Sequence, residues 1–165
     1  MTTTTLDQTD LQLLRLIQKD ASLTNKQLGL KLHKAGNTIF NRVERLKEIG
    51  YIIGTLTIIN REKLGEMLTS FTSIQLKDHS TQSLKSFEQE VVKFTEVMEC
   101  YHMTGDFDFI LKIVVSNMHA YKEFVVNRLA NLPDVGTVRS QFVINEAKRE
   151  LAYTLEMPQL HTNGQ

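Results

Sequence analysis

The chain is poor in cysteine and has no long apolar run. Cys100 is its only cysteine among 165 residues, so no intrachain disulfide and no zinc cluster of cysteines can form, and a reducing compartment is favoured. The longest apolar stretch, Phe109–Val115, is interrupted by Lys112 and is much shorter than the roughly 20 residues that span a bilayer. The N-terminal MTTTTLDQTD has no basic segment followed by an apolar core, so it is not a signal peptide. We therefore expect a soluble, cytoplasmic protein that does not contact a membrane.

The residue sets of common catalytic and metal centres are also missing. The sequence contains no Gly-rich phosphate loop, no Ser/His/Asp set and no Cys/His pair. Its five histidines, at positions 33, 79, 102, 119 and 161, show no ligand spacing such as i, i+4. We therefore expect that the protein is not an enzyme and that it uses neither a metal ion nor a cofactor.

Asp106 and Asp108 form the one carboxylate pair that invites a catalytic or metal-binding interpretation. A catalytic pair needs a nucleophile or an acid as partner, and no suitable residue lies nearby in the sequence. The favoured interpretation is a turn in which Gly105 supplies unusual backbone angles and Asp106 bonds nearby backbone N–H groups. Metal binding and catalysis are the weaker alternatives.

The formal net charge of zero hides an uneven distribution of charge. Residues 1–64 hold ten Lys/Arg and six Asp/Glu, whereas the rest of the chain holds nine Lys/Arg and thirteen Asp/Glu. This asymmetry indicates a basic module that faces an acidic partner and a second module that faces something else.

The stretch Thr24–Gly50 predicts two short helices that meet at a tight turn. Ile39, Val43 and Leu46 recur at helical spacing and pack inward, which leaves a polar and basic face on the second helix. Such side chains suit phosphate oxygens and base edges. The residues expected to contact DNA are Lys34, Asn37, Thr38, Asn41, Arg42 and Arg45.

Within this face we expect different roles for the two arginines. Arg45 lies on the outward side of the helix and is expected to contact base edges. Arg42 lies toward the flank of the helix and is expected to bind phosphate. The plain alternative is that both are ordinary solvated residues of an amphipathic helix. The pattern is a helix-turn-helix signal and predicts binding to double-stranded DNA.

Three helices should fill the first fifty residues. Asp7 is a plausible cap for the first helix, and Asp10 adds a negative charge to its first turn, where the helix dipole favours one. Gly29 lies inside the second helix, where it costs roughly 1 kcal/mol relative to Ala, and a close helix crossing would explain it. The β-branched segment Tyr51–Asn60, with Gly54 at its centre, predicts a small hairpin. A hairpin after the recognition helix is the layout of a winged helix-turn-helix.

After the connector 61–66, the pattern of apolar and polar residues changes and predicts strands as well as helices. The order strand, helix, strand, strand, helix, strand is that of a ferredoxin-like βαββαβ α/β sandwich, so the fold class is α+β. In chain order, the expected elements are strand 68–76, helix 80–94, strands 97–103 and 107–115, a helix capped by Asn117, and strand 138–144, with 152–156 as a possible last strand.

The third of these strands is apolar on both faces. Phe109 and Leu111 project to one side while Ile110 and Val114 project to the other. The two helices cover only one face of the sheet, and large exposed apolar faces are rare on soluble monomers. Face-to-face pairing of two sheets would make a dimer, which also suits the reading of paired DNA half-sites.

Both halves of the chain resemble one family, the leucine-responsive regulatory protein/asparagine-regulator (Lrp/AsnC) transcription factors. The segments that carry the resemblance are LDQTDLQLLRLIQKDASLTNKQLG, NRVERLKEIGYIIGTLTIINREKLG and TGDFDFILKI, the last of which contains a Gly-Asp-x-Asp turn at positions 105–108. The resemblance implies a dimer that assembles further, to an octamer, and an amino acid or related metabolite bound near this turn. The implied effector residues are Tyr101, Met103, Thr104, Gly105, Asp106 and Asp108.

These observations predict a sequence-specific DNA-binding transcriptional regulator that responds to a small-molecule effector, an amino acid or a relative of one. The alternative is a nucleoid-architectural protein that wraps DNA without responding to a ligand. The expected organisation is a DNA-binding domain over 1–60, a linker over 61–67, an effector-binding and oligomerisation domain over 68–157, and a tail over 158–165.

Overall fold

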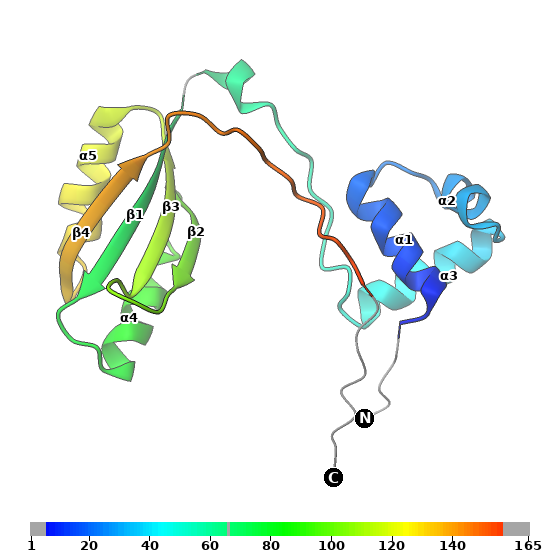
Figure 1. The fold of residues 1–165 in the computed structure, drawn as a ribbon, viewed down its shortest axis with the longest axis horizontal. Coiled ribbons are helices and arrows are strands. Elements are labelled where there is room, and N and C mark those ends of the chain that lie inside the picture. The colour runs from blue at the N-terminus through cyan, green and yellow to red at the C-terminus, as the bar shows by residue number, and fades with distance from the viewer. Residues whose placement is uncertain (1–5, 66, 157–165) are drawn as a thin grey trace, which may run out of the picture. The chain divides into compact units, whose positions relative to one another are not determined.

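The protein folds as two compact units. The computed structural model describes residues 6–65 and 67–156 (Figure 1). Of the described residues, the first unit comprises 6–58 and 148–156, whereas the second unit lies within Ile59–Ala147. Across these described ranges, no helix is both long enough and apolar enough to cross a membrane.

Three helices make up the first unit, as the sequence predicts: α1 (Gln8–Lys19), α2 (Asn25–Leu32) and α3 (Gly36–Glu48). The first two begin at side-chain caps, because Asp7 accepts from the Asp10 N–H and Thr24 accepts from the Gln27 N–H. Each helix contributes apolar side chains to a common core. Its buried members are Leu6, Leu13, Leu28, Ile39 and Leu46.

The hairpin expected over Tyr51–Asn60 is not formed. No residue of this described segment belongs to a strand, and after Ile52 its large side chains stand in solvent, with Ile53 96% and Leu56 85% exposed. β-branched residues favour extended backbone, but an isolated two-stranded hairpin is marginal without an apolar face to pack against. In the first unit, these side chains do not reach the helical core.

Residues 152–156, expected as a possible last strand, do not form one, and side chains of helix α1 bind the backbone of this segment. The Gln18 side chain donates to the Tyr153 carbonyl (2.6 Å) and accepts from the Tyr153 N–H (3.0 Å). Arg15 donates to the carbonyl of Leu155 through Nε (3.0 Å). The residues from Lys148 are therefore part of the first unit.

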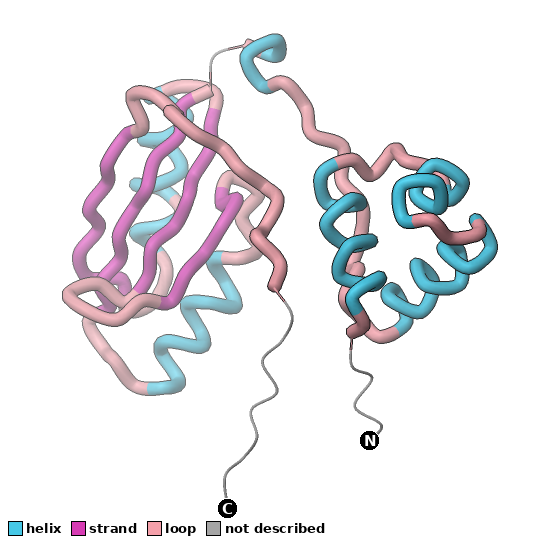
Figure 2. Tube along the Cα trace, turned by 45° about the vertical axis from the view of Figure 1, so that its right-hand side comes forward, coloured by secondary structure: helices cyan, strands magenta, loops and turns pink. Residues whose placement is uncertain are grey.

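The second unit is a four-stranded antiparallel sheet with two helices on one side (Figure 2). The strand order β2-β3-β1-β4 agrees with the ferredoxin-like arrangement that the sequence predicts. The elements are η1 (Arg61–Leu64), β1 (Leu68–Leu76), α4 (Thr81–Val91), β2 (Val97–His102), β3 (Phe109–Val115), α5 (Met118–Asn127), η2 (Leu129–Asn131) and β4 (Val135–Phe142).

Only one face of the sheet is buried within the chain. The alternate residues of β3, from Phe109 to Val115, are buried against α4 and α5, and the side chains between them are half-buried. β1 follows the same alternation but places Thr72 in the core, where its hydroxyl is hydrogen-bonded with that of Tyr121 (3.0 Å). Tyr121 in turn donates to Ser140, so the buried hydroxyl groups have partners, as buried polar groups require.

Candidate functional site

The turn between α2 and α3 is closed by a tight backbone contact. His33 caps the C-terminal end of α2 in the left-handed conformation (φ 52°), and the Lys34 N–H donates to the Gly29 carbonyl (2.9 Å). A Cβ added at Gly29 would lie 2.5 Å from the Lys34 carbonyl oxygen, which is closer than real Cβ contacts. Only glycine therefore allows the chain to approach α2 this closely, which explains the glycine inside a helix and fixes where α3 begins.

The structure brings the predicted DNA-binding residues together on one side of the first unit. Lys34, Asn37, Thr38 and Asn41 are exposed, because Ile39 and Leu46 of α3 occupy the core. Their polar side chains are therefore accessible to a ligand. Four of the predicted residues also line a shallow depression together with two acidic residues of α1; its lining is Asp7, Asp10, Thr38, Asn41, Arg42 and Arg45.

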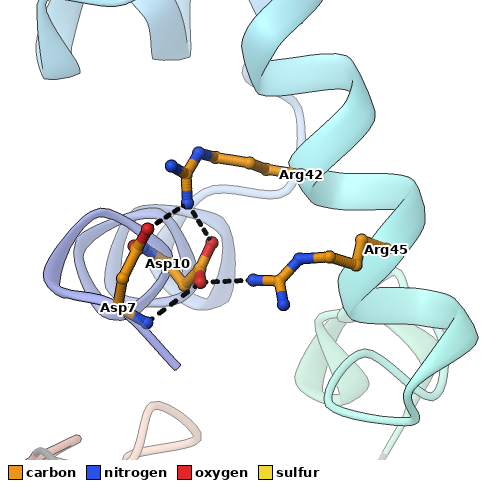
Figure 3. Close-up of polar contacts among 4 residues, drawn as sticks. All are labelled: Asp7, Asp10, Arg42 and Arg45. Atoms are coloured by element: carbon orange, nitrogen blue, oxygen red, sulfur yellow. Dashed lines mark hydrogen bonds and ion pairs between the residues drawn. The ribbon is translucent and has the colours of Figure 1, made fainter. Parts of the chain in front are cut away.

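Arg42 and Arg45 are joined to α1 by ion pairs (Figure 3). Arg42 Nη1 lies 2.6 Å from Asp7 Oδ2 and 2.7 Å from Asp10 Oδ1, and Arg45 Nη2 donates to Asp10 Oδ2. The Asp10 side chain is only 1% exposed. We call these four residues the Asp–Arg cluster. Sequence reasoning assigned the two acids to the start of α1 and missed their pairing with α3.

The two carboxylates also bond each other's backbone. Asp7 Oδ1 accepts from the Asp10 N–H (2.7 Å), and Asp10 Oδ2 accepts from the Asp7 N–H (3.1 Å). The spacing of three residues between the acids is the signal of such a capping box, and it is visible in the sequence. The cap places the buried Asp10 carboxylate where the arginines of α3 reach it.

The contacts within the cluster shift the pKa of Asp7 and the pKa of Arg42. Partial burial by itself would raise the pKa of Asp7, but the hydrogen bond from the Asp10 N–H and the contact with Arg42 together lower this pKa below its ordinary value of 3.8. Hydrogen bonds to Asp7 and then to Asp10 raise the pKa of Arg42. The cluster pairs two carboxylate side chains with two guanidinium side chains, so its formal charge is zero.

A second depression, between α1 and α2, is richer in positive charge. Arg15, Lys19 and Lys31 line it together with Leu16 and Leu32. These cations come from outside the predicted recognition surface, and they contribute to the positive charge of the first half of the chain.

The Gly-Asp-x-Asp turn between β2 and β3 separates its two carboxylates. Gly105 has φ 114°, a conformation that glycine adopts without strain. Asp108 points into the sheet: its Oδ2 accepts from the Leu76 N–H (2.8 Å), and its own N–H donates to the Ile74 carbonyl (2.9 Å). Asp108 therefore braces the end of β1, whereas Asp106 is exposed.

The other predicted effector residues lie around this turn. Met103, Thr104 and Gly105 are exposed, and the Met103 N–H donates to the Asp108 carbonyl (2.8 Å). Tyr101 lies on the sheet face opposite the helices, where its hydroxyl donates to Glu99 (2.7 Å). The turn therefore places exposed apolar and polar groups beside the braced Asp108.

Two family models match the chain, one for each half. Residues 6–53 match a winged helix-turn-helix DNA-binding model, and residues 69–153 match the Lrp/AsnC ligand binding domain. Among curated proteins, the transcriptional regulator AzlB of Bacillus subtilis is 33% identical over 92% of this chain and 96% of its own length. The leucine-responsive regulatory protein of Rhizobium meliloti is 32% identical over 87% of this chain and 92% of its own.

Solved structures with the same fold cover nearly the whole chain. An AsnC family transcriptional regulator from Agrobacterium tumefaciens is 31% identical and superimposes with a TM-score of 0.80, covering 93% of this chain and 97% of its own. A transcriptional regulator from Neisseria meningitidis, solved as a complex with L-Met, is 25% identical and superimposes with a TM-score of 0.84. The match covers 91% of this chain and 97% of the Neisseria chain.

Proposed function

The chain belongs to the Lrp/AsnC family of DNA-binding transcriptional regulators, and from this premise we propose that it is a sequence-specific regulator whose DNA affinity responds to an amino acid. Its homologues are transcriptional regulators and not enzymes. Because a transcriptional regulator must bind chromosomal DNA, we propose that the protein is located in the cytoplasm.

The observation that carries the proposal is the exposed polar side of α3. Asn and Gln side chains suit the donor and acceptor pair of adenine, and Thr and Lys suit other base edges and phosphates. Asn37, Thr38 and Asn41 form this surface with Lys34, and Arg42 and Arg45 lie at its edge. An exposed helix of this kind enters the major groove in helix-turn-helix proteins, so we assign these six residues to the DNA interface.

For the effector, we propose an amino acid bound beside the turn at positions 103–108. The Neisseria relative was solved with L-Met, and a relative from Rhizobium is named as leucine-responsive. In this chain, Tyr101, Met103, Thr104, Gly105 and Asp106 supply the accessible groups of this region. Asp108 acts as the scaffold, since its carboxylate is bonded to β1.

The open sheet face supports a homodimer. Phe71 and Tyr101 are exposed on the side of the sheet that α4 and α5 do not cover, and Ile110 and Val114 are only half-buried there. Covering this face with a second copy would remove apolar area from water, and two-fold symmetry would pair two recognition helices. We also propose that the dimers assemble into an octamer, as the family resemblance implies. Light scattering of the full chain at several concentrations measures the oligomeric state.

The test combines selection of DNA with a ligand screen. The full chain is used to select binders from a random double-stranded library, and the affinity for the enriched sequence is compared with that for a shuffled control. Each of the twenty amino acids is then added to the complex and, separately, to the free protein in a thermal-shift assay, because a bound ligand raises the melting temperature. Enrichment of one motif and an affinity change with at least one amino acid are expected; no enrichment would refute sequence-specific binding.

The architectural alternative has no support among the named relatives, which are regulators of transcription. The same selection addresses it directly. Equal affinity for all sequences together with a flat amino-acid screen would favour wrapping of DNA over regulation.

A further inference from the structure

The Asp–Arg cluster places a buried carboxylate against the recognition helix. Asp10 is fully buried, and its two oxygens accept from Arg42 and from Arg45. A buried charge is stable only when it is paired and hydrogen-bonded, so this carboxylate needs its arginine partners. The same two arginines are the residues of α3 that general reasoning would assign to phosphate or bases.

The geometry favours the internal pairing over phosphate binding. The carboxylates are part of the same folded unit, so their effective concentration near the guanidinium groups is far higher than that of any DNA phosphate. The cluster as a whole is neutral, because two anions face two cations. It therefore offers little attraction to a polyanion, even though it lies beside Thr38 and Asn41 of the predicted DNA surface.

We infer that Asp10 is a positioning residue for DNA recognition: it holds Arg42 and Arg45, fixes α3 against α1, and withholds the charge of both arginines from the phosphates. This inference rests on the proposed function, and it changes the role of the two arginines from direct contact to orientation. Discrimination between sequences is then carried by Asn37, Thr38 and Asn41, which the locked helix presents.

Replacing Asp10 should steepen the salt dependence of DNA binding. In the Asp10→Asn variant, Arg42 keeps Asp7 as a partner, whereas the ion pair of Arg45 within the described residues is with Asp10 alone. Arg45 is thus released to reach a phosphate. Each additional neutralised phosphate steepens the dependence of log K on log salt by about 0.9, so the slope should steepen by about that amount.

The released helix should also discriminate less well. Loss of alignment at one base contact lowers the preference for the selected sequence over the shuffled one by about five- to tenfold. Affinity for shuffled DNA at low salt should rise at the same time. A merely destabilised protein would lose affinity for both sequences and would keep its salt slope.

Asp20→Asn is the matched control. It removes the same formal charge from the same unit, but Asp20 is exposed at the end of α1 and bonds Ser22. If both variants steepen the slope and lower discrimination equally, the effect is general electrostatics and the inference is overturned.

Arg45→Gln provides a second test that does not depend on folding of the Asp10 variant. Arg45 does not neutralise a phosphate in the parent under this inference, so the variant should keep the parent's salt slope while discriminating less well. A slope flatter by about 0.9 would show direct phosphate contact and refute the inference. A parent chain without sequence preference would instead refute the proposed function, so the two failures are distinguishable.

Discussion

Replacing Gly29 with alanine tests whether the close approach at the α2–α3 turn is a structural requirement. Alanine is the better helix former, and by propensity alone Gly29→Ala should stabilise α2 by about 1 kcal/mol. Burial of the added methyl group would contribute up to about 0.8 kcal/mol more. If only these local effects mattered, the variant would be more stable than the parent.

The tertiary contact reverses this expectation. The new Cβ would lie 2.5 Å from the Lys34 carbonyl oxygen, whereas ordinary contacts begin near 3.4 Å. The obstacle is backbone, and the Lys34 N–H is itself bonded to the Gly29 carbonyl, so relief requires movement of the turn. Overpacking costs about 1–3 kcal/mol, and a weakened hydrogen bond costs about 1 kcal/mol more. Set against the favourable local effects, these costs leave a net destabilisation of up to about 2 kcal/mol.

Gly36→Ala is the control for this prediction, since Gly36 is also helical and also near the turn. Its added Cβ would meet its nearest atoms at 3.9 Å, so stability should be unchanged or raised by up to about 1 kcal/mol. Urea unfolding followed by far-ultraviolet circular dichroism measures both variants, and hydrogen exchange of the α2 and α3 amides assigns the change to the first unit. A Gly29→Ala variant at least as stable as the parent would show that the turn yields easily and that our reasoning is wrong.

Three further predictions concern single side chains. In the folded protein, the pKa of Asp7 lies below its ordinary value of 3.8. The ionised Asp7 side chain therefore stabilises the fold above about pH 4, and this stabilisation is lost as the pH falls through the folded pKa. The difference in urea midpoint between the parent and Asp7→Asn should be larger at pH 5 than at pH 3. Burial raises the pKa of Cys100 from 9.0 to about 11, so thiol labelling at neutral pH should be about 100-fold slower in the folded chain than in urea, and equal rates would contradict the burial. Asp108→Ala removes the acceptor of the Leu76 N–H and should destabilise the second unit by about 1–3 kcal/mol, measured by hydrogen exchange in β1; unchanged protection would exclude a bracing role.

Much of the fold was predictable because its signals are local. Asp7 caps the start of helix α1 as its capping pattern indicates, and β1 occupies Leu68–Leu76 as the alternation of its residues predicts. The strand order of the second unit follows from the sequence of elements, since few topologies connect them without crossing. The apolar spacing of α3 likewise identified the helix side that faces the core.

The hairpin prediction failed because a strand needs more than β-branched residues. Tyr51–Asn60 has the composition of a strand pair, but within the first unit it finds no sheet and no apolar surface to complete it. A strand is defined by its hydrogen-bonded neighbour. The same argument applies to residues 152–156, whose backbone is bonded to the side chain of Gln18.

By itself, the sequence determined where the helices begin, which face of each is apolar, the topology of the sheet, and the family. Only the tertiary structure decided what the two arginines of α3 contact, because the packing of the three helices brings Asp7 and Asp10 to arginines 32 to 35 residues away. Periodicity and capping act over one or two helical turns, and an ion pair across two helices depends on their packing. The physical reason is burial. The Asp10 carboxyl group lies where water is excluded, so the fold must provide its hydrogen-bond partners, and no local sequence pattern identifies them.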